Sequence, residues 1–361
     1  MIRPRATRAA SSDLRSIARR KAWVTCQSLN DTASRAFEAR GSCHTTLAMR
    51  PISQLRTMNK LTTKDRAQIL GMMVEGMSIR SISRTTAASK NTIVKLLADA
   101  GGAFSEYQSK AFHNLPYKRI QCDEIWSFVY SKEKNAPADM KAAGMAGDLW
   151  TWTAICADIK LMPCWSVGAR NAAVANEFMN DLAGRLANRV QLTTDGNRTY
   201  LDAVNEAFVG EIDYAMLVKQ YGAPEGAAQE RRYSPAEYTG AVKQAISGSP
   251  EFKRVSTSYV ERANLSMRMG MRRFTRLTNA FGKKVENHVH ALAIYFMHYN
   301  FGRIHQTLRV TPAMQAGIAK SPMSFEEMAA IIDAAQPEPT KRGRYKKRKA
   351  KDRVERQECG R

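Results

Sequence analysis

The sequence has no run of apolar residues that approaches the roughly eighteen needed to cross a bilayer, which excludes a membrane-spanning protein. Its six cysteines include no CxxC pair and no cluster, so neither a disulfide framework nor a structural zinc site is expected, and a reducing cytoplasm fits best. Acidic residues are scarce, with 33 Asp and Glu against 56 Lys and Arg and a formal net charge of +23. That excess points to a polyanionic partner, either nucleic acid or an anionic membrane surface.

The 361-residue chain is long enough for two domains. Both of its ends differ in composition from its middle. Residues 1–57 carry eleven basic and three acidic side chains without sustained periodicity. We expect them to form a basic, disordered extension, or to precede a true initiator at Met49 or Met58. Residues 321–361 are expected to form a C-terminal helix and a basic disordered tail that binds phosphate groups without sequence preference.

Residues 58–102 have the pattern of a helix-turn-helix. A capping box at Thr62-x-x-Asp65 begins an amphipathic helix, a second short helix covers 78–86, and a small turn leads to a third helix. The third helix is expected to end at Gly101-Gly102. Its outward, polar side chains are the candidates for reading a DNA major groove: Lys90, Asn91, Thr92 and Lys95. The alternative is a plain three-helix bundle.

After a linker at 103–116, residues 117–320 alternate between strand and helix patterns. The order is three strands, a helix, a strand, a helix and a strand, followed by an insertion near 221–256 and two further helices. The expected strands are 117–130, 150–159, 162–167, 190–194 and 212–218, and the expected helices are 171–188, 197–208, 258–281 and 285–299. This order predicts an α/β, ribonuclease-H-like domain with a mixed central sheet flanked by helices, preceded by the all-α helix-turn-helix domain.

Three carboxylates stand where the ligands of a metal-dependent phosphoryl-transfer site would be. Asp123 lies inside the first strand, Asp195 stands where the fourth strand meets a glycine turn, and Glu261 lies in the helix after the insertion. Cleavage of DNA by two divalent ions needs carboxylates that hold the ions roughly 3.5–4 Å apart. Mg²⁺ prefers oxygen ligands and takes few of them from protein, so two or three acids suffice.

The surroundings of Glu261 favour a metal ligand. Residues 253–284 include nine Lys or Arg but one acid, Glu261, whereas a solvent-exposed salt-bridge face would interleave the signs. Arg268 shares its helical face seven residues later, and Arg268 and Arg272 are candidates for holding DNA beside the metals. A surface ion pair of Glu261 with Arg254 or Arg268 remains the alternative.

Two other groups of polar residues are weaker candidates. Glu124 directly follows Asp123, so strand alternation sends its side chain to the opposite face of the sheet, where a supporting or structural role is expected. Four histidines lie in the C-terminal part of the domain without the compact spacing of a zinc site: His288, His290, His298 and His305.

Residues 62–320 resemble bacterial insertion-sequence transposases of the DDE class, most closely the insertion sequence 1 family. The likeness rests on the helix-turn-helix, the strand Cys-Asp-Glu-Ile-Trp-Ser-Phe-Val, the Thr-Asp-Gly turn and the helix Tyr-Val-Glu-Arg-Ala-Asn-Leu-Ser-Met-Arg. The resemblance implies a catalytic and metal-binding triad of Asp123, Asp195 and Glu261 that holds two Mg²⁺ or Mn²⁺ ions. It also implies binding of double-stranded DNA, both element ends and target, in the nucleoid of a bacterial cytoplasm.

The chain departs from that family at its N-terminal side. Members often carry a cysteine zinc-binding segment ahead of the helix-turn-helix, and here Cys26 and Cys43 alone precede it. End recognition is therefore expected to rest on the helix-turn-helix. Bringing two DNA ends together is compatible with a homo-oligomer on DNA, although no residue in the sequence indicates one.

The sequence thus predicts a DNA transposase that cleaves element ends by hydrolysis and joins the freed 3′-hydroxyl groups to target DNA. One alternative is a DNA-binding regulator derived from a transposase, with a ribonuclease-H-like body that has lost catalysis. The intact carboxylate trio favours the enzyme. A structure-selective nuclease is a third possibility, but it would not need a domain that reads sequence.

Overall fold

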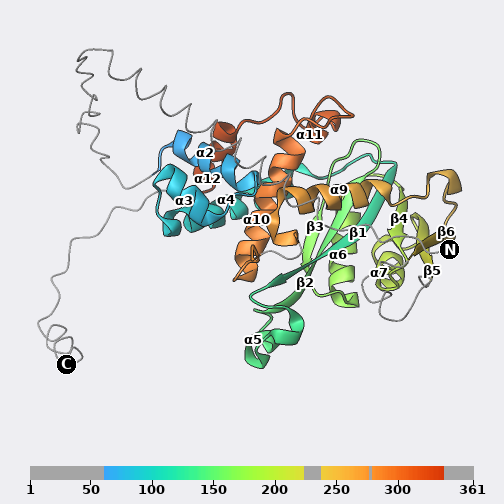
Figure 1. The fold of residues 1–361 in the computed structure, drawn as a ribbon. Helices are drawn as coiled ribbons and strands as arrows, with labels where there is room; N and C mark the ends of the chain where they lie inside the picture. The colour runs from blue at the N-terminus through green and yellow to red at the C-terminus, as the bar shows by residue number, and fades with distance from the viewer. Residues whose placement is uncertain (1–60, 223–236, 276–278, 337–361) are drawn as a thin grey trace, which may run out of the picture. The chain divides into compact units, whose positions relative to one another are not determined.

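The computed structural model describes residues 61–222, 237–275 and 279–336. The extension expected at 1–57 and the basic tail from residue 337 lie outside the described residues. In the described part of the chain, no helix is long and apolar enough to cross a membrane. A mixed sheet forms the centre of the fold, with helices against it (Figure 1).

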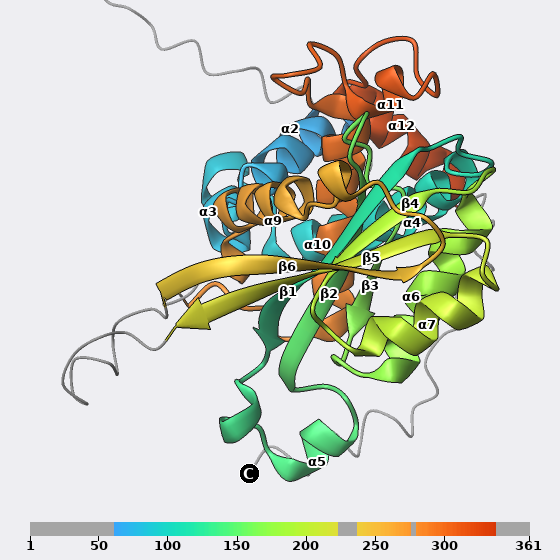
Figure 2. The ribbon, with the colours of Figure 1, turned by 90° about the vertical axis from the view of Figure 1, so that its right-hand side faces the viewer.

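The sheet has six strands in the order β3-β2-β1-β4-β5-β6. Their bounds are β1 Arg119–Val129, β2 Gly147–Cys156, β3 Trp165–Gly168, β4 Gln191–Asp195, β5 Asp213–Gly222 and β6 Glu237–Ser247. The first three strands form an antiparallel meander, because β1 pairs with β2 and β2 with β3. The strand β4 lies parallel to both β1 and β5, and β6 adds an antiparallel edge (Figure 2).

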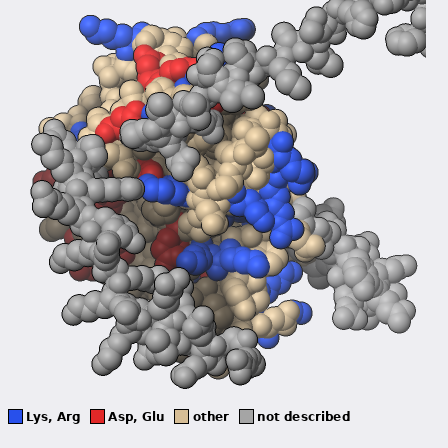
Figure 3. Space-filling model, turned by 90° about the vertical axis from the view of Figure 1, so that its left-hand side faces the viewer, with Lys and Arg blue, Asp and Glu red and all other residues tan. Residues whose placement is uncertain are grey.

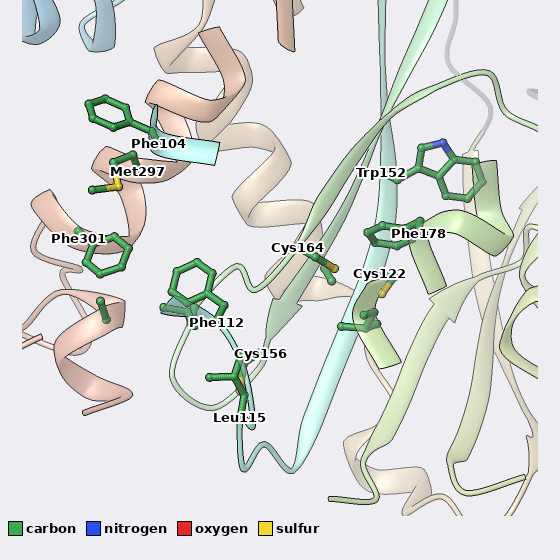
Figure 4. Packing of buried hydrophobic residues seen from close by; sticks show 14 of the residues in the cluster. Phe104, Phe112, Leu115, Cys122, Trp152, Cys156, Cys164, Phe178, Met297 and Phe301 are labelled. Atoms are coloured by element: carbon green, nitrogen blue, oxygen red, sulfur yellow. The ribbon is translucent and has the colours of Figure 1, made fainter. Parts of the chain in front are cut away.

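Each face of the sheet has its own hydrophobic core, because alternate residues of a strand point to opposite faces. On one face, Cys122 of β1 packs in a cluster with Trp152 and with Phe178 of α6 (Figure 4). On the other face, Ile125 of β1 packs in a second cluster with Val260 of α9. The helices of the first face are α6 Ala172–Arg185 and α7 Thr199–Phe208, and those of the second are α9 Ser258–Gly270 and α10 Val285–Met297.

Three helices precede the sheet, at the positions that the sequence predicts for the helix-turn-helix. They are α2 Thr63–Val74, α3 Ile79–Thr86 and α4 Lys90–Ala111. The expected capping box between Thr62 and Asp65 is present, and Ala87 turns the chain after α3 with a φ of 57°. A C-terminal helix, α12 Phe325–Ala335, packs against α2 and α4, and the Arg66 guanidinium binds the Asp333 carboxylate at 2.6 Å.

The third of these helices is longer than the sequence predicts. The helix α4 passes through Gly101 and Gly102 and ends at Ala111, so the linker predicted at 103–116 is wrong for residues 103–111. Phe104 and Gln108 lie on its buried face, and the Gln108 side chain donates to the Ala293 carbonyl of α10. Packing against α10 therefore outweighs the helix-ending tendency of the two glycines.

The segment expected to be an insertion, 221–256, contributes the edge strand β6 instead. The large apolar residues of β6, which are Tyr238, Val242 and Ile246, are four residues apart and exposed, so the segment lacks the alternation that predicts a strand. The helix expected over 258–281 is also shorter. The helix α9 ends at Gly270, and a 3-10 turn at Arg272–Phe274 follows, whose Phe274 is buried.

We predict opposite effects of the same substitution at the two adjacent glycines of α4. A Cβ at Gly101 would lie 2.4 Å from the His290 Cβ and 2.5 Å from its Cα, whereas a Cβ at Gly102 would meet nothing within 4 Å. Gly101→Ala should therefore lower the free energy of unfolding by roughly 1–3 kcal/mol through overpacking. Gly102→Ala should raise it by up to about 1 kcal/mol, because alanine favours helix. Urea denaturation measures both, and equal effects would contradict the close approach of α4 to α10.

Candidate active site

The candidate site lies where the parallel strands β1 and β4 separate. Their pairing ends at Gln121 and Thr193, and two residues further along each strand stand Asp123 and Asp195. Beyond this point β1 and β4 are no longer paired by backbone hydrogen bonds, so a gap opens between the two strands. Side chains of both strands can therefore meet there, as the sequence predicts for Asp123 and Asp195.

A third carboxylate joins them, and it is Glu124. Oxygen atoms of Asp123, Glu124 and Asp195 all lie within 4.8 Å of one another. Strand alternation does send Glu124 to the face of α6 and α7, as expected. Its side chain nevertheless reaches Asp195, because the opening between β1 and β4 admits a side chain from that face.

Two side chains connect Glu124 to Asp195. The Arg170 Nε donates to Glu124 Oε2 at 3.1 Å, and its Nη2 lies 3.6 Å from Asp195 Oδ2. The Asn197 side-chain amide donates to Glu124 Oε1 at 3.2 Å, while its backbone amide donates to Asp195 Oδ1 at 3.0 Å. The Arg170 guanidinium also lies over the ring of Trp150, 4.9 Å from its centre. These contacts fix the orientation of both carboxylates.

Asp123 is held from the other face of the sheet. Its Oδ2 accepts a hydrogen bond of 2.9 Å from the side-chain amide of Asn264 on α9, and its Oδ1 accepts one from the Glu124 backbone amide. Thr153 of β2 joins this contact by donating to the Asn264 side-chain oxygen at 3.2 Å. The helix α9 therefore has a direct connection to the carboxylate cluster.

Burial and mutual repulsion dominate the electrostatics of the cluster. Burial, followed by the charges of Asp195 and Glu124, raises the pKa of Asp123 to about 7, although the Asn264 hydrogen bond opposes this shift. Burial and the charge of Asp195 also raise the pKa of Glu124, against the opposing effect of Arg170. Three carboxylates and one guanidinium leave an excess of negative charge in a partly enclosed space.

That excess charge fits a divalent cation. An Mg²⁺ ion takes oxygen ligands at about 2.1 Å, so two ligands of one ion lie at most about 4.2 Å apart. The spacing within 4.8 Å would need only a small contraction to hold an ion. The Asp195 side chain is one-third exposed whereas that of Glu124 is 1% exposed, so an ion with access to a substrate would lie on the Asp195 side.

Glu261, the third member of the predicted triad, lies outside this cluster. Its carboxylate binds the Lys219 ammonium at 2.6 Å and accepts a short hydrogen bond from Thr257. The side chain of Glu261 is 40% exposed. Burial lowers the pKa of Lys219, but the hydrogen bond and charge of Glu261 outweigh it, with smaller contributions from Tyr221 and Asp123. The Lys219 ammonium thus lies within electrostatic range of both Glu261 and Asp123.

The ion pair of Glu261 differs from the alternative considered from the sequence, a pair with Arg254 or Arg268: the cation bound to Glu261 is Lys219 of β5, and Arg254 binds Glu251. Arg268 and Arg272 are exposed at the end of α9 and in the turn that follows. Lys90, Asn91 and Lys95 are exposed and Thr92 half-buried at the start of α4. Figure 3 shows the side of the molecule that carries α2 and α3, where Lys and Arg side chains gather over part of the surface.

Sequence reasoning missed four residues of this site: Arg170, Asn197, Lys219 and Asn264. One signal was present for Asn264, which follows Glu261 by three residues and so shares its side of the helix. Asn197 follows Asp195 by two residues, a spacing typical of an Asx turn. Arg170 and Lys219 come from elements far away in sequence, and nothing local distinguishes them from other basic residues.

Comparisons with known proteins give limited similarity. No model of a protein family matches this sequence, and no curated protein matches it. A solved structure of the piggyBac transposase synaptic complex with hairpin DNA is 10% identical over 76% of this chain and 71% of that chain, with a TM-score of 0.35. The Mos1 strand transfer complex is 12% identical over 76% of this chain and 83% of that chain, with a TM-score of 0.20.

We predict that Asp123 contributes a loss of stability to the metal-free protein as pH rises from about 4 to about 7, while His288, whose pKa burial lowers to about 3, acts in the opposite direction over the same range. The folded state keeps a proton on Asp123 up to pH 7, while the unfolded chain releases it near pH 4, so the stabilisation is complete below pH 4 and is lost by pH 7. Urea unfolding in a chelator at pH 5 and pH 7 measures the change. Relative to wild type, Asp123→Asn should lose the part of the pH dependence in which stability falls as pH rises, whereas the exposed Asp148→Asn should keep the wild-type pH dependence. An identical pH dependence in wild type and Asp123→Asn would contradict the assignment.

Proposed function

We propose that this protein is a DNA transposase that cleaves the ends of an insertion sequence and joins their 3′-hydroxyl groups to target DNA. The observation that carries the proposal is the meeting of Asp123 and Asp195 where β1 and β4 separate. In the proposed ribonuclease-H-like domain, these strands are the natural source of metal ligands because Asp123 and Asp195 each stand two residues beyond the last pair that joins β1 to β4. The chemistry is phosphodiester hydrolysis followed by strand transfer, without a covalent protein intermediate.

The chain's own residues have distinct roles in this proposal. Asp123 and Asp195 hold the divalent ions, two Mg²⁺ or Mn²⁺, which when bound activate an attacking oxygen and stabilise the leaving oxygen. Asn264 orients Asp123 from α9, and Asn197 orients Asp195 through its backbone amide. Arg170 offsets part of the negative charge of the cluster.

Glu261 remains our proposed third ligand, and Glu124 is its competitor. Glu261 stands one helical turn before Asn264, which contacts Asp123, so its side of α9 faces the site. Lys219 balances its charge when no metal is bound. Glu124 lies closer to the other two acids, but its two oxygens already accept hydrogen bonds from Arg170 and Asn197, and its side chain is 1% exposed. We therefore assign Glu124 to positioning.

Substitution of the two glutamates separates these roles. Glu261→Gln should lower Mg²⁺-dependent cleavage about a hundredfold or more, as should Asp123→Asn and Asp195→Asn, because metal catalysis contributes several kcal/mol to transition-state stabilisation. Glu124→Gln keeps one acceptor oxygen for Arg170 or Asn197 and loses the other, so it should disturb the position of the site without removing a metal ligand and should lower the rate far less. Nicking and joining of a labelled duplex that carries the element ends measures all four variants.

Two results of this experiment would contradict the proposed roles. Near wild-type rates for Glu261→Gln, together with loss of activity in Glu124→Gln, would make the third ligand Glu124. Retained cleavage in both Asp123→Asn and Asp195→Asn would contradict metal-dependent catalysis at this site altogether. Binding of the same duplex serves as the control for folding, because the proposed end-binding surface belongs to other helices.

We propose that α2, α3 and α4 act as the helix-turn-helix that recognises the element ends. The support for this proposal is the exposure of Lys90, Asn91 and Lys95 at the start of α4, where the helix can present them to a major groove. In the proposed insertion sequence 1-type transposase, these helices select the element ends and the carboxylate site cleaves them. Two ends would be held by a homo-oligomer in the bacterial nucleoid.

Two ion pairs of α4 provide a matched test. Lys95 binds Asp99 and Lys110 binds Glu106, each at 2.6 Å and with the same spacing on the helix, and both lysines are exposed. Lys95→Glu should weaken binding to element ends about tenfold and lower the slope of its salt dependence by about one, the loss of one phosphate contact. Lys110→Glu should leave binding within about twofold of wild type. Equal losses in the two variants would show that net charge, and not the start of α4, governs binding.

A further inference from the structure

A second charged cavity lies beside α9, away from the carboxylate cluster. Its volume is about 280 Å³, several times the roughly 30 Å³ that a water molecule occupies in the liquid. Its walls come from α9, from the turn after β2 and from the segment that connects α10 to α11 Pro312–Gln315. Its polar and charged lining includes Lys160, Tyr259, Arg262, Ser266, Arg303 and His305.

The cationic groups of this cavity face one another without an acid between them. All the lining residues are described, and none is Asp or Glu. The nearby acid Asp158 forms a bidentate contact with the Arg119 guanidinium, and its charge also acts on Lys160. Burial, followed by the charges of Lys160 and Arg303, lowers the pKa of His305, which shows that these three groups lie within electrostatic range of one another.

Two further features indicate a prepared site. Lys160 is 8% exposed, its ammonium lies 3.4 Å from the centre of the Tyr259 ring, and its backbone carbonyl accepts a hydrogen bond from the Tyr299 hydroxyl. The lysine is thus fixed at the cavity wall. The Nδ1 atom of His305 is buried and has no hydrogen-bond partner in the structure. A buried polar atom without a partner costs free energy, which a bound group could recover.

We propose that this cavity binds a phosphate group of DNA, and that Arg303 and Arg262 are its main ligands. A phosphate supplies several acceptor oxygens and the negative charge that the lining lacks, and arginine binds it through paired donors. The fixed ammonium of Lys160 and the hydroxyl of Ser266 would complete a shell of donors. This inference rests on the proposed function only in taking DNA, and not a free phosphate compound, as the source of the phosphate.

The position of the cavity explains why DNA is the expected source. Tyr259, Arg262 and Ser266 line the cavity from one side of α9, and Glu261 and Asn264 occupy the opposite side. A helix with its side chains is about 10–12 Å across, and duplex DNA carries one charge per roughly 1.7 Å of its axis. A duplex that crosses the exposed ridge of α9 therefore offers phosphates to both sides at once.

The test compares salt-dependent DNA binding of Arg303→Gln and Lys134→Gln. Lys134 is an exposed lysine in the short 3-10 turn Glu133–Asn135, in the same β1–β2 connection as α5 Ala138–Ala142, which lies away from α9 and α11 in Figure 2. The probe is a 30-base-pair duplex without element ends. Loss of one phosphate contact in Arg303→Gln should lower the slope of log affinity against log salt by about one, and Lys134→Gln should keep the wild-type slope. Arg262→Gln should behave like Arg303→Gln.

A second arm uses inorganic triphosphate as the free-phosphate probe. We expect it to compete with the duplex only weakly. An unchanged slope in Arg303→Gln would overturn the proposal, and so would tight triphosphate binding that Arg303→Gln abolishes while duplex binding stays intact. The comparison is repeated in an Asp123→Asn background. If Arg303→Gln lowers the slope in this background but the wild-type protein cleaves no DNA, the phosphate site is supported and the transposase function is rejected.

Discussion

Repulsion among three carboxylates is the constraint on which the rest of this structure depends. Asp123, Glu124 and Asp195 have oxygen atoms within 4.8 Å of one another, and burial raises the pKa of the first two. Such an arrangement costs free energy, so it persists only where packing elsewhere determines the backbone. The two cores, one on each face of the sheet, supply that packing and hold β1 and β4 in place.

The helix α9 transmits this constraint to the surface. The side-chain oxygen of Gln121 accepts hydrogen bonds from the backbone amides of Tyr259 and Val260, at 2.9 and 3.1 Å. These bonds fix the start of α9 on β1. Val260 and Met267 pack into the second core, and Asn264 binds Asp123. The helix therefore cannot shift without moving Glu261 relative to the cluster. A metal ligand on α9 would owe its position to one strand, β1, which also carries Asp123.

The order of the first five strands and their helices was predictable from sequence because they have clear periodicity, whereas the edge strand β6 was missed; Asp195 was visible at a strand end followed by glycine. The meeting of Glu124 with Asp195 was not predictable, since it depends on where pairing between β1 and β4 stops. Periodicity gives the face of a side chain but not the gap between two strands. The helix α4 was misjudged at Gly101 for a related reason: its continuation depends on contact with α10, which lies almost two hundred residues away.

In the proposed function, a DNA polyanion approaches a carboxylate cluster that is itself negative, and the distribution of basic residues in the chain reduces the resulting repulsion. At physiological salt, charges are screened beyond about 8 Å, so repulsion from the cluster acts only on the nearest phosphates. Arg170 lies 3.6 Å from Asp195, and the charge of Asp123 acts on Lys219, so both cations offset part of this repulsion. Farther out, the proposed contacts at the start of α4 and in the cavity beside α9 would hold the rest of the duplex. In the proposed function, the net charge of +23 would retain DNA while bound divalent ions neutralise the local repulsion.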